Sequence, residues 1–430
     1  MSRLIYTLLI YAAAPIAFLN TVWRGLRDPA FRDRWAERFG FVEAPVAGAS
    51  IWIHAVSVGE VQAAAVLIRA LRQRRPDSYI VVTTATPTGA SRVKALFPTG
   101  VQHVYLPYDL PGAVRRFLRR IAPHIAIVME TEIWPNLYRE CFRADVPIVL
   151  ASARLSEKSV RRMSLFSSVF KQALHQNVSI AAQSARDAER FRSLGAPAER
   201  VQETGNIKFD IEVAPQLKEQ GRTLRTTHFP RSFVWVAGST HEGEESLVLD
   251  AHRMLMAEIP DAMLILVPRH PQRFESVRQW LSAQNVSYVA RSRGELPTSS
   301  TRILLGDTLG ELMMFYAAAD VAFVGGSFVT IGGHNLLEPA ALGIPVLTGP
   351  HNFNAPDIAA RLFESGAALE LTSAAELSRT LISLAREPER RAQMGRAALD
   401  AIQRNRGALE RVLAIVDKQL TLSAENTARN

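Results

Sequence analysis

The sequence predicts an α/β protein built from two doubly wound parallel-sheet domains and an apolar N-terminal helix. Its 430 residues are enough for two or three domains at about 100–200 residues each. From residue 51 onward, short runs rich in Val and Ile alternate with amphipathic segments. This alternation is typical of a parallel sheet covered by helices on both faces. It stops once, near residues 206–232, and then resumes, which predicts two such sheets.

The chain begins with an apolar segment. Residues from Leu4 to Val22 are almost all apolar, and arginines and tryptophans follow closely. A membrane-spanning helix needs about 20 apolar residues, so the segment is just long enough to span, with the arginines at a cytoplasmic interface. The alternative is a buried or interfacial helix that never crosses the bilayer. Because no small-residue cleavage site precedes the arginines, a cleaved signal peptide is not expected.

The next elements are predicted from apolar runs and from helical periodicity. In the first domain, strands are expected at residues 51–57, 79–85, 101–108, 125–130, 147–151 and 179–183, with helices at 61–75, 113–121 and 160–174. In the second domain, strands are expected at 233–238, 263–267, 303–305, 321–324 and 345–347, and residues 374–420 have a helical pattern.

These elements group into five predicted segments. They are an apolar helix with a basic membrane-facing segment (1–45), a first doubly wound domain (46–205), a linker (206–232), a second doubly wound domain (233–400) and a C-terminal helical tail (401–430). Ligands of such sheets bind at the carboxyl ends of the strands, so we expect the substrates in a cleft between the two domains.

Composition excludes several classes of protein. A content of 48% hydrophobic and 21% charged residues excludes a mostly disordered chain. The single cysteine, Cys141, cannot form an internal disulfide, and no Cys/His cluster has the spacing of a zinc site. There is no P-loop motif of a nucleoside triphosphatase. The net charge of +9 predicts an anionic partner, such as nucleic acid, a membrane or a phosphorylated substrate.

Three charged residues in the first domain and at its junction with the linker are candidates for chemistry, namely Glu60, Glu130 and Lys208. Glu60 follows the first strand, at the start of a helix, where it is either a general base or a residue that complements the helix dipole. Glu130 ends another strand and is costly to bury unless it is paired or functional. Glu132 is solvated or hydrogen-bonded to the next turn. Lys208, at the hinge, either binds a phosphate or Glu130, or is an ordinary surface lysine.

The second domain carries groups suited to an anion. Small and hydroxylated residues at 238–245 follow a strand and precede a helix, which leaves backbone N–H groups for an anion or simply forms an N-cap. Arg269 follows the next strand and suits a phosphate or carboxylate. The glycine-rich segment 324–333 precedes a helix with Glu338 in its first turn, where Glu338 could bind a ribose. Glycines that only form turns are the alternative.

Five motifs in chain order resemble those of one known family. They are His54–Glu60, Met129–Asn136, Gly205–Lys208, Ala237–Glu245 and Val324–Ser327. Together they are similar to the 3-deoxy-D-manno-octulosonic acid (Kdo) transferases of lipopolysaccharide synthesis, from the apolar N-terminus to about residue 400. The segment from Glu338 to Val346 resembles, more generally, the nucleotide-binding segment of two-domain GT-B glycosyltransferases.

The resemblance implies a GT-B fold of two Rossmann-like domains facing a cleft, and a reaction. The first domain (46–205) would bind the acceptor, and the second (233–400) would bind the CMP-sugar. Kdo moves from CMP-Kdo to a lipid A precursor (lipid IVA) with inversion, CMP is released, and neither a metal nor another cofactor is bound. Glu60 would be the general base, and Glu130 and Lys208 would stabilise the transition state. The residues that match CMP contacts are Pro268, Arg269, Leu309, Gly310, Glu311, Asn335, Leu336, Leu337 and Glu338.

The same resemblance implies the partners and the location. They are the CMP-Kdo donor, the phosphorylated lipid A precursor and the inner membrane, with the catalytic domains on the cytoplasmic side, attached by the apolar segment. Nucleic acid is not an expected partner, because no aromatic–basic RNA motif is present. The alternatives are a GT-B enzyme with a UDP-sugar donor, a nucleotide-sugar epimerase, and a non-catalytic basic protein that binds membranes or RNA.

Overall fold

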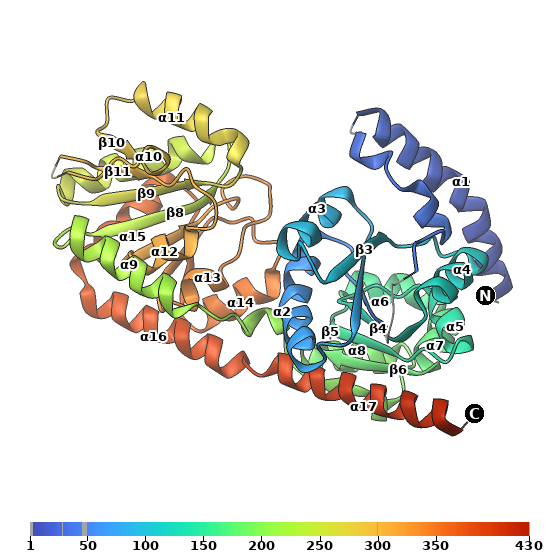
Figure 1. The fold of residues 1–430 in the computed structure, drawn as a ribbon. Helices are drawn as coiled ribbons and strands as arrows, with labels where there is room; N and C mark the ends of the chain where they lie inside the picture. Colours follow the sequence, from blue (N-terminus) through green and yellow to red (C-terminus); the bar gives the residue numbers. More distant parts are fainter. Residues whose placement is uncertain (1–2, 28, 45–49, 299, 430) are drawn as a thin grey trace. The chain divides into compact units, whose positions relative to one another are not determined.

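The computed structural model describes residues 3–27, 29–44, 50–298 and 300–429. The chain divides into two compact units (Figure 1). Unit 1 comprises Met1–Asp210 and Arg406–Asn430, and unit 2 comprises Ile211–Asn405. Each unit contains one sheet, and every strand pair in it is parallel. The predicted class of two doubly wound domains is therefore confirmed.

In the described part of unit 1, seven strands form the sheet in the order β3-β2-β1-β4-β5-β6-β7. The strands are β1 (Ser50–His54), β2 (Tyr79–Thr84), β3 (Val101–Tyr105), β4 (Pro123–Met129), β5 (Ile148–Ala153), β6 (Val178–Ala182) and β7 (Val201–Glu203). The helices are α1 (Arg3–Arg27), α2 (Val58–Arg74), α3 (Pro87–Leu96), α4 (Pro111–Ile121), α5 (Pro135–Arg143), α6 (Glu157–Ser164), α7 (Ser167–His175), α8 (Ala185–Ser193) and α17 (Ala408–Arg429), with 3-10 turns η1 (Pro29–Phe31), η2 (Trp35–Phe39), η3 (Ala198–Arg200) and η4 (Ile207–Phe209).

Both faces of this sheet are covered, which explains its unbroken apolar strands. Side chains alternate along β1, so Ile51 and Ile53 lie in one core with α2, α3 and α17, and Trp52 lies in the other with α4, α5, α7 and α8. The Trp52 indole packs edge-on against Phe117, with the ring centroids 4.9 Å apart. Burial on both faces fixes the direction in which the strand ends point.

Unit 2 repeats this architecture, in the order β10-β11-β9-β8-β12-β13-β14 over its described residues. Its strands are β8 (Val234–Thr240), β9 (Met263–Pro268), β10 (Tyr288–Ala290), β11 (Ile303–Leu305), β12 (Val321–Val324), β13 (Val346–Thr348) and β14 (Ala368–Glu370). Its helices are α9 (Pro215–His228), α10 (Glu244–Glu258), α11 (Phe274–Ser282), α12 (Leu312–Ala317), α13 (Leu337–Ala340), α14 (Pro356–Glu364), α15 (Ala374–Arg386) and α16 (Pro388–Asn405), with 3-10 turns η5 (Pro271–Arg273) and η6 (Arg291–Arg293).

The structure differs from the sequence interpretation in several elements. Residues 206–232, expected to be a linker, contain α9, whose Gly221 approaches Ala317 of α12 within unit 2. The expected helix at 160–174 is two helices, α6 and α7. The expected helical stretch 374–420 is three helices, and its last one, α17, belongs to unit 1. The short strands β7, β10 and β14 were not predicted, because they are partly exposed edge strands, unlike the equally short but fully buried β11 and β13.

Strand order reverses once in each sheet, and this is where α/β folds bind ligands. In unit 1 the reversal lies between β1 and β4, and in unit 2 between β8 and β12. The segments that follow these four strands include the motifs His54–Glu60, Met129–Asn136, Ala237–Glu245 and Val324–Ser327. The topology therefore places most of the singled-out polar residues at the two expected binding edges.

Candidate active site

Glu60 closes a capping box at the beginning of α2. Its backbone N–H donates to the hydroxyl of the N-cap residue Ser57 (3.4 Å), and its own carboxylate accepts from the Val56 N–H (2.9 Å) and from the Ser57 hydroxyl (3.2 Å). These bonds satisfy donors that a helix start leaves free. Glu60 therefore has the structural role at the beginning of a helix that the sequence allowed.

The surroundings of Glu60 give it a second property. The side chain is half-buried, and burial raises the pKa of Glu60 to about 7 although the Val56 and Ser57 bonds lower it. The negative charges of Glu130 and Glu132 raise it further. A carboxyl group with a pKa near 7 is suited to take a proton at neutral pH.

Glu130 forms a buried ion-pair cluster directly after β4. Its carboxylate contacts Lys208 Nζ through one oxygen and Arg154 Nε through the other, both at 2.8 Å. The Glu130 side chain is only 6% exposed. Burial alone would raise the pKa of Glu130, but the two cations outweigh it and hold that pKa below its usual range. Glu130 is therefore ionised. Lys208 contacts Glu130, which is one of the two partners, a phosphate or Glu130, that the sequence allowed.

Backbone geometry directs these side chains. Glu130 has φ 55°, a left-handed conformation that is uncommon for residues other than glycine. Ser152, on the neighbouring strand β5, has φ 49°, and its hydroxyl accepts the N–H of Ile207 (3.2 Å) in the turn that carries Lys208. Asn206 accepts the N–H of Lys208 (3.0 Å). Sequence reasoning missed Arg154 and Ser152, because no periodic signal marks either.

Glu132 has the local role that the sequence allowed. The indole N–H of Trp134 donates to Glu132 Oε2 at 2.8 Å. Burial and the charge of Glu130 raise the pKa of Glu132, whereas the Trp134 bond lowers it. Glu132 contributes to the site through its charge, which acts on Glu60.

In unit 2, the glycine-rich loop after β12 binds a carboxylate of this chain. Glu244, at the start of α10, is fully buried, and its two oxygens accept the backbone N–H groups of His241, Gly326, Ser327 and Phe328 at 2.7–3.0 Å. The sequence left two interpretations open for these loops, an anion site or a purely structural role, and these four N–H groups have the structural role. The physical reason is that Glu244 is the nearest anion when the two loops meet.

Gly325 explains why the loops approach so closely. A Cβ at this position would lie 2.7 Å from the carbonyl oxygen of Ser239 and 2.8 Å from the Cα of Thr240. Only glycine fits, so its role here is close approach. Arg273, four residues after Arg269, holds the other first-turn carboxylate, Glu245, with two bonds of 2.8 and 2.9 Å.

Arg269 lies beside three histidines after β9. Pro268 is the last, buried residue of β9, and the Arg269 side chain is exposed. Burial and, to a smaller extent, the charge of Arg269 lower the pKa of His334 to about 3, and the same two causes lower the pKa values of His241 and His270. The rings of His241 and His334 stack with their Nε2 atoms 2.8 Å apart. The histidines are therefore neutral, and Arg269 supplies the positive charge.

Leu309, Gly310 and Glu311 form the turn before α12. Leu309 is 75% exposed, and Gly310 has φ 84°, which favours glycine. The Glu311 carboxylate accepts from Nε and Nη2 of Arg291, the closest approach being 2.7 Å. These bonds lower the pKa of Glu311. The turn is thus held from one side and presents an apolar side chain on the other.

Residues Asn335 to Glu338 form the beginning of α13. Asn335 donates to Glu338 Oε1 (3.2 Å) and accepts the N–H of Leu337 (3.2 Å). Leu336 and Leu337 are 2% and 1% exposed, so their side chains belong to the core. Any contact that these two leucines make with a ligand is restricted to their backbone. Asn335 and Glu338 are the residues of this group with accessible polar side chains.

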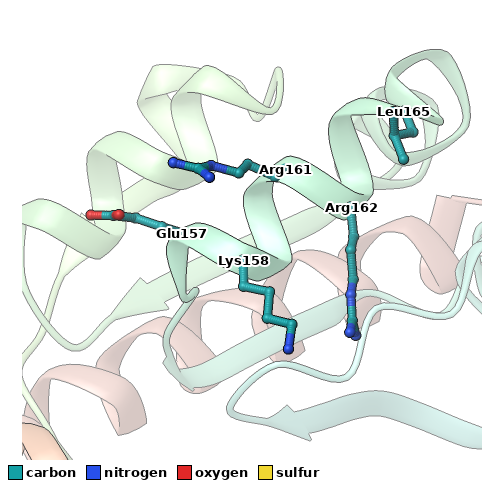
Figure 2. A pocket seen from close by; sticks show the side chains of 5 residues that line it. All are labelled: Glu157, Lys158, Arg161, Arg162 and Leu165. Atoms are coloured by element: carbon teal, nitrogen blue, oxygen red, sulfur yellow. The ribbon is translucent and has the colours of Figure 1, made fainter.

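A basic pocket lies on α6 of unit 1. Its volume is about 520 Å³, and it is lined by Glu157, Lys158, Arg161, Arg162 and Leu165 (Figure 2). Lys158 and Arg162 extend from the same side of the helix. The carboxylate of Glu157 is engaged by Arg186 and Arg190, at 2.5 and 3.1 Å. This pocket was not predicted from the sequence, although its three cations, Lys158, Arg161 and Arg162, lie within about one turn of α6.

A metal ion has no evident site in the part of the chain that the structure describes. There, no group of three or more His, Cys, Asp or Glu side chains is arranged to hold one. The histidine cluster around Arg269 is no exception to this finding.

Comparison with known families agrees with the two-unit architecture. A family described as 3-deoxy-D-manno-octulosonic-acid transferase (kdotransferase) matches residues 33–211. A family described as glycosyl transferases group 1 matches residues 199–400. Together the two matches extend over both sheets.

Close relatives extend over the whole chain. The 3-deoxy-D-manno-octulosonic acid transferase of Haemophilus influenzae is 42% identical over 425 residues, which cover 98% of this chain and 99% of the relative. The transferase of the same name from Bordetella pertussis is 38% identical over 438 residues, with 98% and 100% covered.

Solved structures with similar folds are more distant in sequence. A UDP complex of MnaA from S. aureus has a TM-score of 0.55 at 16% identity, covering 87% of this chain and 98% of that one. A UDP-GlcNAc 2-epimerase from Neisseria meningitidis has a TM-score of 0.53 at 15% identity, covering 84% of this chain and 100% of that one. At such identities the likeness concerns the fold alone.

Proposed function

This chain belongs to the 3-deoxy-D-manno-octulosonic acid (Kdo) transferase family, and from that premise we propose the donor, acceptor and mechanism of its reaction. It is a glycosyltransferase of lipopolysaccharide biosynthesis with a GT-B fold. The proposed donor is CMP-Kdo, and the proposed acceptor is a phosphorylated lipid A precursor, lipid IVA. The observation that carries the mechanism is a half-buried Glu60 with a pKa of about 7, beside the cluster of Glu130 and Lys208.

Glu60 acts as the general base in this proposal. The acceptor hydroxyl transfers its proton to the Glu60 carboxylate while its oxygen bonds to the anomeric carbon of Kdo. The bond from that carbon to the CMP phosphate breaks, and its electron pair leaves with CMP. Attack opposite the leaving group inverts the anomeric centre. A general base contributes about 10²–10⁴-fold to a rate.

Lys208 and Glu130 act as a fixed charge pair. Lys208 Nζ has three N–H donors, of which Glu130 accepts one. The remaining donors suit the carboxylate of Kdo or the charge that grows on the departing phosphate. Because Glu130 is held by both Arg154 and Lys208, the lysine is positioned before substrate arrives.

The nucleotide contacts are proposed for unit 2. Arg269 is the exposed cation next to β9, and Pro268 places it at the end of the strand. Asn335 and Glu338 offer polar groups that suit a ribose, with backbone contacts from Leu336 and Leu337. In the turn of Leu309, Gly310 and Glu311, the Leu309 side chain offers an apolar contact to the cytosine of CMP. The reaction as proposed uses no metal and no further cofactor.

The acceptor and the location follow from charge and from α1. The three cations of the α6 pocket suit the phosphates of a lipid A precursor. Helix α1 contains one segment, Arg3–Leu26, that is long and apolar enough to contact a bilayer, with a mean hydropathy of 1.7. We place the enzyme at the inner membrane, attached by this N-terminal segment with both units on the cytoplasmic side.

The test is Kdo transfer to a detergent-solubilised lipid A precursor, followed by mass spectrometry. With CMP-Kdo we expect the acceptor mass to rise in steps of one Kdo, and Glu60→Gln to lower the rate at least 100-fold. The matched control is Glu376→Gln, because Glu376 closes the same kind of capping box at α15, with the Thr372 N–H donating at 2.8 Å. Glu376→Gln should retain wild-type turnover.

A donor panel separates this proposal from its alternatives. UDP-sugars offered in place of CMP-Kdo should give neither transfer nor epimerisation. Transfer from a UDP-sugar by well-folded protein, with none from CMP-Kdo, would overturn the proposed donor. Equal losses in Glu60→Gln and Glu376→Gln would instead reduce Glu60 to a helix cap.

A further inference from the structure

Helix α1 is attached to unit 1 along its whole length. Near its beginning, the Tyr6 hydroxyl donates to Asp109 Oδ2 (2.8 Å) and the Thr7 hydroxyl to Asn136 Oδ1 (2.9 Å). Near its end, the Thr21 hydroxyl lies 3.2 Å from that of Tyr108. Both ends of the helix are therefore held by side chains of the folded domain.

The acceptor at the beginning of α1 is itself well fixed. Asp109 is 5% exposed, and its carboxylate also accepts the backbone N–H groups of Asn136 (3.2 Å) and Leu137 (2.7 Å) at the start of α5. Between the two ends, the Phe18 ring packs against Trp35 and Phe39, with centroids 5.5 and 5.6 Å apart. These contacts connect α1 to α5 and to the turn η2, not to one isolated side chain.

The contacts follow one stripe of the helix. The partly or fully covered positions recur every three or four residues, at Arg3, Tyr6, Thr7, Ile10, Ala14, Phe18, Thr21, Val22 and Gly25. This spacing is that of one helix face. The opposite face is exposed and apolar along the same length, with Leu4, Ile5, Leu8, Leu9, Tyr11, Ile16, Leu19, Trp23 and Leu26 from 47% to 70% exposed.

This arrangement conflicts with a helix that crosses a bilayer. A spanning helix needs about 20 residues that leave the water-soluble domain, whereas α1 is bound to that domain at Thr7 and again at Thr21. The 14 residues between them cover about 21 Å at 1.5 Å per residue. Crossing would draw Asp109 and Asn136 into the hydrocarbon or break their bonds to α1, and either is costly.

Charged residues around α1 suit an anionic surface. Arg3 begins the helix, and its charge acts on Arg139 of α5, which is also near Arg143 of α5 and Arg115 of α4. Their closeness is visible in the pKa of Arg139, which burial lowers and which the charges of Arg3, Arg143 and Arg115 lower further. Arg24, near the other end, is exposed and lies over the Phe31 ring. Cations beside an apolar face are typical of a helix at a bilayer interface.

We propose that α1 lies in the plane of an anionic bilayer, with its outward apolar face among the acyl chains and its inward stripe fixed on unit 1. The proposal rests on the membrane attachment proposed above. Of the two alternatives that the sequence allowed, it selects the interfacial helix over the spanning helix. Unit 1 would then lie directly on the lipid surface, and the arginines would contact phosphate headgroups. Such contacts contribute to binding in proportion to the anionic lipid present.

The test measures how deep three points of α1 lie. Bimane labels are placed at Ile5→Cys, Ile16→Cys and Trp23→Cys, which lie within about 20° of one line along the outward face at 3.6 residues per turn. The labelled proteins are bound to vesicles of phosphatidylethanolamine and phosphatidylglycerol with bromines at defined acyl positions. Native Cys141 is fully buried, so unmodified protein serves as the labelling blank. Leu399→Cys, exposed on α16, controls for quenching unrelated to α1.

An in-plane helix predicts equal depths for all three labels. A deep Ile16 label between shallow labels at residues 5 and 23 would overturn the proposal in favour of a spanning helix. Absence of any vesicle binding would overturn the membrane attachment as well. Each variant is also assayed for Kdo transfer in detergent, where failure would concern the transferase and not the mode of attachment.

A second measurement tests the anionic surface. Arg115→Glu combined with Arg143→Glu should lower partition into vesicles rich in phosphatidylglycerol by about tenfold or more. Binding to pure phosphatidylcholine should change little. Equal binding of wild-type protein to both lipids would contradict the role of the arginines, and a loss of detergent activity in the double variant would reveal misfolding.

Discussion

Two glutamates of this chain show how surroundings decide the use of a residue. Glu60 and Glu376 both occupy the third position of a helix that begins with a serine N-cap, and both accept the N–H of the residue before that serine. Burial and negative neighbours raise the pKa of Glu60, whereas hydrogen bonds from Thr372 lower the pKa of Glu376. The motif is shared, and only the first carboxyl is suited to accept a proton near neutral pH.

The pKa of Glu60 predicts a pH dependence. A general base is active when ionised, so kcat/KM for wild-type enzyme should be level above about pH 7 and fall about tenfold per pH unit below it. The profile is measured in detergent with CMP-Kdo. In Glu60→Gln the limb near pH 7 should disappear, and in Glu376→Gln it should remain. An acidic limb that begins only near pH 4.5 would exclude Glu60 as the base.

At the scale of elements, the loop after β12 depends on one carboxylate. Glu244 satisfies four backbone N–H groups, three of them in Gly326, Ser327 and Phe328. In Glu244→Gln an amide NH2 replaces one oxygen and faces two of these donors, which should cost about 3 kcal/mol or more. The loop and the neighbouring α13 should then be less ordered.

We expect Glu244→Gln to raise the KM for CMP-Kdo at least tenfold and to speed hydrogen exchange at residues 325–328. The control is Glu242→Gln, since Glu242 is exposed in the same turn, and it should change neither quantity. Unchanged exchange in Glu244→Gln would mean that the carboxylate does not order the loop.

At the scale of the whole molecule, unit 1 is completed by the C-terminus. Helix α17 begins more than 200 residues after the last strand of unit 1, yet its Ala408, Val412, Leu413 and Val416 are fully buried in the core with Ile51 and Ile53. Asp210 fixes the beginning of α17 by accepting the N–H groups of Gly407 (2.6 Å) and Leu409 (2.7 Å). Unit 1 is therefore built from two segments that are distant in the sequence.

This dependence predicts a difference between two leucines of one helix. Leu413→Ala should destabilise unit 1 by about 3 kcal/mol, because a fully buried side chain leaves a cavity. Leu422→Ala, at a position 44% exposed, should cost less than about 0.5 kcal/mol. Hydrogen exchange resolved by peptide measures the effect in β1 and β4. Equal protection of these strands in both variants would show that α17 is not part of the unit 1 core.

Much of the fold could be predicted from the sequence, since strands buried on both faces read as continuous apolar runs. The short strands β7, β10 and β14, the helix α9 and the break between α6 and α7 could not, because each is decided by packing and not by local pattern. Similarly, the positions of Glu60, Glu130 and Lys208 at strand ends or at a hinge could be predicted, but not the contact of Arg154 with Glu130.

The sequence by itself determined the fold class, the family and the residues that carry charge at the strand ends, because these depend on periodicity and on motifs in order. Only the tertiary structure decided which partner each charged side chain contacts. Glu244 binds the glycine-rich loop, Lys208 binds Glu130, and α1 lies along unit 1. The physical reason is that electrostatic and hydrogen-bonding partners are distant in the chain, and folding alone brings them within about 3 Å of each other.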